Sequence, residues 1–121
     1  MVKIVAFKEK TWMPERTDYR QWDHLCRCYG AELQMVSDFG EIIIPDNHKV
    51  VILDEPSEVK LQDFEHPENV VYIFGRTGLN DLNDKFKSDY QVRIDYEPDI
   101  PLFGVVTGGI VLYDRFLKNI D

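Results

Sequence analysis

Apolar residues gather along the chain into short runs separated by polar segments, which is the pattern of strands buried inside a sheet. Turn-forming residues such as Asp38 and Gly40 bound several of these runs. The pattern predicts extended segments at Val2 to Phe7, Glu32 to Ser37, Glu41 to Pro45, Val50 to Leu53, a run that starts at Val70, and Tyr90 to Tyr96.

Between Asp18 and Tyr29 the apolar side chains recur every three or four residues, which predicts an amphipathic helix. Asp18 is the expected N-cap, Gln21 completes a capping box, and Gly30 is the expected C-cap. The stripe that this helix is expected to bury comprises Tyr19, Trp22, Leu25, Cys26 and Tyr29.

Two further helices are expected. Ser57 is the expected cap of a short helix that ends at Phe64. A C-terminal helix from Leu102 to Lys118 is apolar almost all round over its first three turns. Glycine inside a helix costs roughly 1 kcal/mol relative to alanine, so Gly108 and Gly109 predict close approach by another backbone or by a ligand.

This succession of strands and helices predicts the α/β class, with a mostly parallel sheet flanked by helices. The 121 residues show no internal repeat, low-complexity tract or linker. Residues 1–121 are therefore expected to form a single domain.

The chain carries 14 basic and 22 acidic side chains, a net charge of −8. Non-specific binding of nucleic acid depends on neutralised phosphates, so this charge disfavours it. Residues 1–30 nevertheless hold six basic against four acidic residues, so any anionic partner would bind there, although a solvated face with no partner is the favoured interpretation. No apolar run approaches the roughly 20 residues of a membrane span. Lys3 and Lys8 argue against a signal peptide, so the expected location is the cytoplasm.

Arg20, His24 and Arg27 follow a spacing of four and three along the face of the first helix that lies opposite its apolar stripe. Three potentially cationic groups on one face could receive a phosphate backbone or a substrate anion. The alternative is a solvated face that Asp23 partly neutralises.

Cys26 and Cys28 lie two residues apart in this helix and point to different sides, so we expect reduced thiols that share no metal ion. Asp54 and Glu55 directly follow a strand, where α/β proteins bind ligands. They could bind a ribose or a cation, but the favoured interpretation is a pair of acids at the start of the next helix. No metal ion is expected.

Three patches of this sequence resemble the motifs of the SPOUT superfamily, the knotted S-adenosylmethionine-dependent RNA methyltransferases. The first helix closes on Tyr29 and Gly30 before a strand, which is similar to the first motif. Residues 71–79 (VYIFGRTGL) resemble the second motif, an apolar strand that runs into a Gly-x-Glu-Gly type of turn. Residues 92–94 and 101–114 resemble the third motif, a strand and a loop followed by a helix rich in small residues.

The resemblance implies a fold, a cofactor and partners. In this family the last strand and helix thread through an earlier loop to form a C-terminal trefoil knot. The loops of the second and third motifs bind S-adenosylmethionine, a homodimer completes the site, and RNA is the substrate. The positions that the resemblance assigns to cofactor binding are Ile73, Phe74, Gly75, Arg76, Thr77, Gly78, Ile94, Tyr96, Leu102, Val105 and Gly108.

The chain departs from the family at its usual catalytic polar positions. His24 stands where members that methylate ribose carry an arginine, and Thr77 stands at the glutamate of the second motif. Pro101 and Phe103 replace the serine and asparagine that open the third motif. The remaining candidates for catalysis are His24, Arg20 and Arg27, and Arg76 is a candidate for binding a carboxylate or a phosphate.

The sequence therefore favours an S-adenosylmethionine-binding, SPOUT-type RNA methyltransferase that forms a homodimer, with its activity in question because of these replacements. The alternative is a non-catalytic homodimeric interaction module that retains the knotted fold. A third hypothesis is a nucleotide-binding or receiver-like domain built around Asp54. It is disfavoured because Lys8 and Glu9 stand where a receiver needs an acidic pair.

Overall fold

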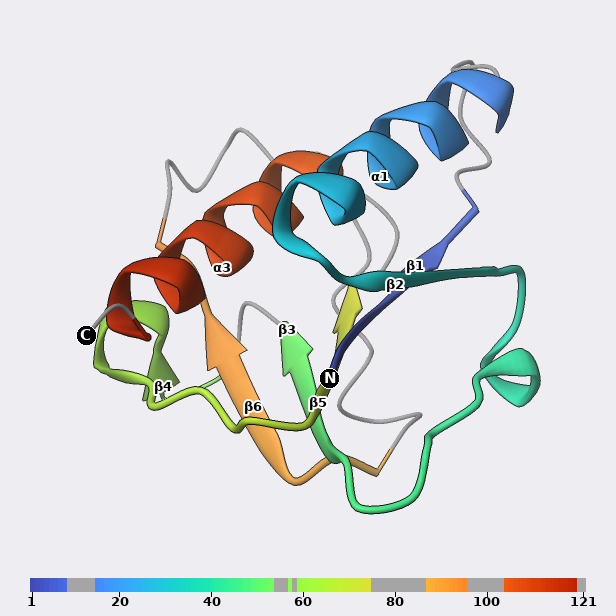
Figure 1. Cartoon of the computed structure of the whole chain (residues 1–121). Helices are drawn as coiled ribbons and strands as arrows, with labels where there is room; N and C mark the ends of the chain where they lie inside the picture. The colour runs from blue at the N-terminus through green and yellow to red at the C-terminus, as the bar shows by residue number, and fades with distance from the viewer. Residues whose placement is uncertain (9–14, 54–56, 58, 75–86, 96–103, 120–121) are drawn as a thin grey trace.

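The computed structural model describes residues 1–8, 15–53, 57, 59–74, 87–95 and 104–119, without the side chains of residues 15–18 (Figure 1). Its strands are β1 (Val2–Phe7), β2 (Glu32–Val36), β3 (Lys49–Leu53), β4 (Val59–Lys60), β5 (Val70–Phe74) and β6 (Tyr90–Arg93). Its α-helices are α1 (Glu15–Tyr29) and α3 (Gly104–Lys118), and its short 3-10 helices are η1 (Phe39–Glu41) and η2 (Leu61–Asp63).

A single six-stranded sheet in the order β2-β1-β5-β3-β6-β4 organises the structure. Every neighbouring pair of strands is parallel, so the carboxyl ends of the strands meet at one edge of the sheet (Figure 1). The central strand β5 is buried along its whole length between β1 and β3. The structure thus confirms the predicted α/β class, and all the strand pairs it describes are parallel.

Helices α1 and α3 lie side by side over one face of the sheet (Figure 1). The core between these layers includes the fully buried Tyr72 and Val111, and the indole of Trp22 packs on the ring of Phe74 with their centroids 5.4 Å apart. Trp22 and Cys26 are buried as predicted, but Tyr19 is 52% exposed. Tyr19 lies near the start of α1, and the predicted apolar stripe is buried only further along the helix.

The second face of the sheet has its own apolar cluster, which includes Val5, Ile52 and Ile73. The segment after η1 covers part of this face with the half-buried Ile42 and Ile44. The buried ammonium group of Lys3, which is 6% exposed, donates a hydrogen bond of 2.7 Å to the carbonyl of Ile43. This bond ties the segment to the sheet and removes the cost of an unpaired buried charge.

The predicted strand from Glu41 to Pro45 is wrong, because Glu41 ends η1 and residues 42–45 form no strand. The alternation of half-buried Ile42 and Ile44 with exposed Ile43 imitates a strand. Its backbone is satisfied by a side chain instead, since the amide of Gln34 bonds the carbonyl of Glu41 and the N–H of Ile43.

The predicted helix from Ser57 to Phe64 is also wrong. Val59 and Lys60 form the short parallel edge strand β4 beside β6, and η2 follows it. Ser57 does not act as an N-cap, because its buried hydroxyl has no hydrogen-bond partner among the residues that the structure describes. The acidic and polar residues that suggested a helix start occur equally often in turns.

The remaining bounds differ from the prediction by a few residues. Helix α1 begins at Glu15, so Asp18 lies in its first turn and is not its N-cap. Strand β2 ends at Val36, β3 begins at Lys49, and β6 ends at Arg93. Of the predicted C-terminal helix, residues 102 and 103 lie outside the described residues. In the part of the chain that the structure describes, no helix is long and apolar enough to cross a membrane.

Candidate functional site

The carboxyl edge of the sheet is formed by strands whose last residues are apolar. Ile73 and Phe74 end β5 and are buried, and in the register of the sheet Phe74 pairs with Ala6 of β1 and Leu53 of β3. Ile94, just beyond β6, is half-buried against the same core. This edge is where parallel α/β proteins place their ligands.

Several positions assigned to the cofactor lie outside the residues that the structure describes. Among the others, Ile73 and Phe74 stand at the end of the central strand, while Val105 lies in the first turn of α3 and packs against the core. The positions outside the described residues are Gly75, Arg76, Thr77, Gly78, Tyr96 and Leu102.

Gly108 has a close neighbour, and that neighbour is a side chain of the same protein. A Cβ atom added to Gly108 would lie 2.5 Å from Cζ3 of Trp22 and 3.2 Å from Cδ2 of Leu25. A Cβ atom on Gly109 would lie 3.8 Å from Leu25, an ordinary contact distance. Close approach at Gly108 is therefore confirmed, but it is the indole ring of α1, rather than a backbone or ligand, that occupies this space.

The three catalytic candidates lie on the exposed face of α1, as the sequence predicted. Arg20, His24 and Arg27 are all exposed, and Arg27 forms an ion pair of 3.1 Å with Asp23. Because residues 20 and 27 are seven positions apart, the charges spread over about 10 Å of helix. The three side chains thus form one solvent-facing polar stripe, in which Arg20 and His24 form no ion pair with any described residue.

The two cysteines occupy different environments, as predicted. Burial and the nearby carboxylate of Asp23 raise the pKa of Cys26 to about 11, so this thiol stays protonated and inert near neutral pH. Cys28 is exposed, with its sulfur 3.8 Å from Nε2 of His24. No group of three or more metal-binding side chains occurs among the described residues.

A polar cluster that the sequence reasoning missed lies between β5 and α3. The imidazole of His66 has no exposed surface, its Nδ1 is 2.6 Å from the hydroxyl of Tyr72, and its Nε2 is 2.7 Å from Oδ2 of Asp114. Lys118 also bonds this carboxylate, at 2.8 Å, and Arg115 lies 3.4 Å from the Tyr72 hydroxyl. We call these five residues the His66 cluster.

The hydrogen-bond partners of His66 indicate which of its ring nitrogens carries the proton. A carboxylate only accepts hydrogen bonds, so Nε2 of His66 carries its proton toward Asp114 and Nδ1 accepts the hydroxyl proton of Tyr72. Burial lowers the pKa of His66 and outweighs the opposing influence of Asp114, whose charge Lys118 already compensates. Burial likewise raises the pKa of Tyr72 to about 12. Both rings are therefore neutral at physiological pH.

The imidazole of His66 cannot contact a substrate directly, because it has no exposed surface. The His66 cluster joins residues that are 48 positions apart in the sequence. Within it, Asp114 and Lys118 have the helical spacing of four, which is recognisable from the sequence.

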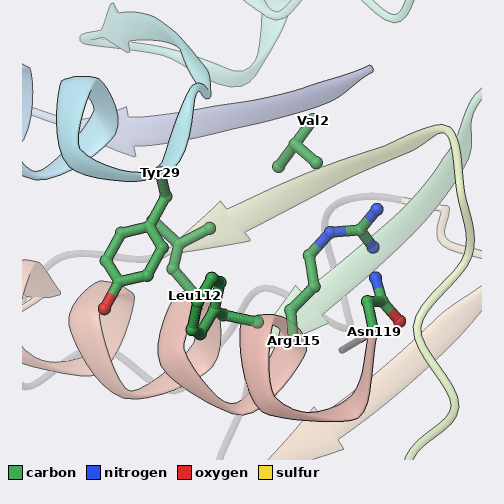
Figure 2. Close-up of a pocket in the computed structure, with 6 residues that line it drawn as sticks. Val2, Tyr29, Leu112, Arg115 and Asn119 are labelled. Carbon is green, nitrogen blue, oxygen red and sulfur yellow. The ribbon is translucent and has the colours of Figure 1, made fainter. Parts of the chain in front are cut away.

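A hollow of about 200 Å³ opens next to this cluster (Figure 2). Val2 and Leu112 supply apolar surface, and the rings of Tyr29 and Phe116 meet edge-to-face with centroids 6.2 Å apart. Arg115 and Asn119 are its polar lining residues. It is smaller than the roughly 300 Å³ at which small-molecule sites usually begin, so we do not assign the cofactor to it.

Helix α3 is apolar on both of its faces. Gly108, Val111 and Leu112 are buried against the rest of the chain. The opposite face also lacks charge and comprises Val106, Ile110, Tyr113 and Leu117, flanked by Phe116; each of these side chains is between 38% and 53% exposed. We call these five residues the outer face of α3.

Comparison with known proteins finds solved structures that share this fold. No family model and no curated protein matches the sequence. A candidate RNA methyltransferase from Bacillus anthracis has a TM-score of 0.70 and 15% identity, covering 98% of this chain and 94% of its own. A structure concerned with 2-OH methylation of C/U34 on tRNA has a TM-score of 0.72 and 10% identity, covering 97% and 89%.

A third structure, assigned to a methylase family in Haemophilus influenzae Rd KW20, has a TM-score of 0.69 and 14% identity, covering 96% of this chain and 65% of its own. At such identities the likeness speaks for the fold. The chain accordingly has the α/β fold of these RNA methyltransferase structures, as the resemblance in its sequence led us to expect.

Proposed function

We propose that this protein is an S-adenosylmethionine-dependent RNA methyltransferase of the SPOUT type, which acts as a homodimer and carries the C-terminal trefoil knot of that family. The observation that supports the proposal most strongly is the fold match along nearly the whole chain to structures described as RNA methyltransferases. Three sequence patches in the family's order support it independently.

The described residues at the proposed cofactor site fit its chemistry. S-adenosylmethionine supplies a methyl group activated on a sulfonium sulfur, and its adenine needs an apolar surface. Ile94, which is half-buried just beyond β6, would offer part of such a surface at the carboxyl edge of the sheet, where the buried Ile73 and Phe74 end the central strand. Gly75 to Gly78, with Tyr96 and Leu102, are proposed to complete the site.

The exposed face of α1 is proposed to bind the RNA. Arg20 and Arg27 would pair with phosphates, and His24 would accept the proton released from the methylated group. The exposure of these side chains supports this assignment, because a large substrate can reach each of them.

Methyl transfer to RNA tests this function. With tritiated S-adenosylmethionine and total tRNA from a bacterium, we expect label in the RNA fraction, and we expect His24→Gln to reduce the rate by about a hundredfold. Lys49→Gln is the matched control, because it removes an exposed charge at the amino ends of the strands, away from the carboxyl edge proposed to bind the cofactor. No transfer with any RNA fraction, from a protein that binds the cofactor, would favour the non-catalytic module instead.

The outer face of α3 supports the proposed homodimer. Large side chains expose roughly 150–250 Å² when free, so five that are about half exposed offer on the order of 500 Å² per copy. Stable interfaces bury about 1,200–2,000 Å² in total, and two such faces reach the lower bound of about 1,000 Å² for a biological interface. Each chain has a net charge of −8, and a face without charged side chains limits the electrostatic repulsion between two copies.

Replacing Ile110 with aspartate is expected to weaken the homodimer at least about a hundredfold, because the interface would bury an unpaired carboxylate. Sedimentation equilibrium measures the effect. Ile43→Asp is the control, since Ile43 is 65% exposed and lies outside α3. Equal dissociation constants for the two variants would show that the outer face of α3 is not the interface.

A further inference from the structure

The His66 cluster fastens the C-terminal half of α3 to the middle of the chain. Asp114 bonds His66, and Arg115 donates to the carbonyls of Pro67 and Glu68. Lys118 donates to the carbonyls of Leu61 and Phe64, at 2.7 and 2.8 Å. Three residues of one helical turn thus hold the segment from η2 to β5.

The same turn carries three of the five residues of the outer face of α3. Tyr113, Phe116 and Leu117 alternate along the helix with Asp114, Arg115 and Lys118. Any displacement of the inner side of this turn therefore moves the outer side as well.

Protonation of His66 would disrupt the cluster for a reason of hydrogen-bond polarity. Nδ1 would become a donor toward the Tyr72 hydroxyl, which already receives the guanidinium of Arg115. The hydroxyl proton would then have no acceptor among the described residues, in a side chain with no exposed surface.

The positive charge of a protonated His66 would also disrupt the cluster. The groups that face His66 are Tyr72 on β5 and Asp114, Arg115 and Lys118 on α3, whose charges sum to +1 while His66 is neutral. The carboxylates of Glu65 and Glu68 flank His66 in its own segment and are exposed. An imidazolium would raise the sum to +2 inside the protein, where charges interact strongly.

We propose that the His66 cluster is a proton-controlled latch: neutral His66 holds the C-terminal half of α3 in place for self-association, and protonation of His66 releases it and weakens the homodimer. This regulation rests on the homodimer proposed above. Because burial lowers the pKa of His66, folding favours the neutral form of its imidazole. The latch is therefore complete above about pH 6.5, the value for a free histidine, and is lost as the pH falls through the lowered value.

The test compares dimer dissociation constants from about pH 8 to about pH 5 for the wild type and for His66→Gln. Glutamine presents one acceptor and one donor, as neutral histidine does, but it does not titrate. We expect the wild-type dissociation constant to rise at least about fivefold on acidification. The rise should persist in the control His48→Gln and disappear in His66→Gln.

A second measurement tests whether the latch opens, independently of whether the protein dimerises. Hydrogen exchange of the amides of residues 111–118, corrected for the intrinsic effect of pH, should show loss of protection at acid pH in wild type but not in His66→Gln. The same acid rise in both dimers, or unchanged protection, would overturn the latch. A protein that is monomeric at every pH would refute the coupling to association, while the exchange data would still decide whether the latch opens.

Discussion

The Gly108→Ala variant is expected to be less stable than the wild type by about 1–2 kcal/mol, although alanine is the better helix former by roughly 1 kcal/mol. The new methyl group would lie 2.5 Å from the indole of Trp22, which is 2% exposed and packed on Phe74, so the ring has little room to move. Overpacking of this kind costs about 1–3 kcal/mol or more. Thermal unfolding at one protein concentration measures the difference.

The neighbouring Gly109→Ala is the matched control. Its methyl group meets only Leu25, at 3.8 Å, so the gain in helix propensity should raise stability by about 1 kcal/mol. The two alanine variants should therefore melt on the order of 10 °C apart. If Gly108→Ala melts at or above the wild-type Tm, the glycine is not there to admit Trp22.

Loss of the carboxylate at Asp114 is expected to lower the free energy of unfolding by about 2–3 kcal/mol. Asp114→Ala leaves the buried N–H of His66 without an acceptor and removes the partner of Lys118. Asp114→Asn keeps an acceptor for His66, so we expect about half the loss. Denaturant unfolding near neutral pH measures both variants.

The control is the other ion pair with helical spacing of four, between Asp23 and Arg27. Arg27 is 79% exposed, so Asp23→Ala should cost less than about 0.5 kcal/mol. Similar losses from Asp114→Ala and Asp23→Ala would contradict the structural role of the His66 cluster.

Features with a local signature were predictable from the sequence. The strands at Val2–Phe7 and Val70–Phe74 have continuous apolar runs, and the structure places both strands where the runs stand. The stripe of Arg20, His24 and Arg27 follows from helical spacing alone and is exposed as expected. Patterns with periods of two and 3.6 residues are sufficient for such features.

Features that depend on distant partners were not predictable in the same way. Residues 42–45 alternate like a strand, but the side chain of Gln34 takes up the backbone groups that a neighbouring strand would have paired. His66 finds its partners in Tyr72 and Asp114, and the latter is 48 residues away. One chain offers no local sign of such a contact.

The two glycines of α3 fall between these cases. Their cost in a helix correctly indicated close approach at Gly108, but the identity of the neighbour, Trp22, depends on how α1 and α3 cross. Of the proposed cofactor site, the sequence patches point to the edge of the sheet, while the side-chain geometry of residues 75–78 lies outside the described residues.

Isothermal titration calorimetry with S-adenosylmethionine, and in parallel with its demethylated product, tests the central proposal most directly. We predict one binding site per chain with a dissociation constant in the micromolar range, about −8 kcal/mol. No detectable binding of either compound, at protein concentrations where the homodimer is intact, would contradict the proposed methyltransferase and leave the non-catalytic interaction module.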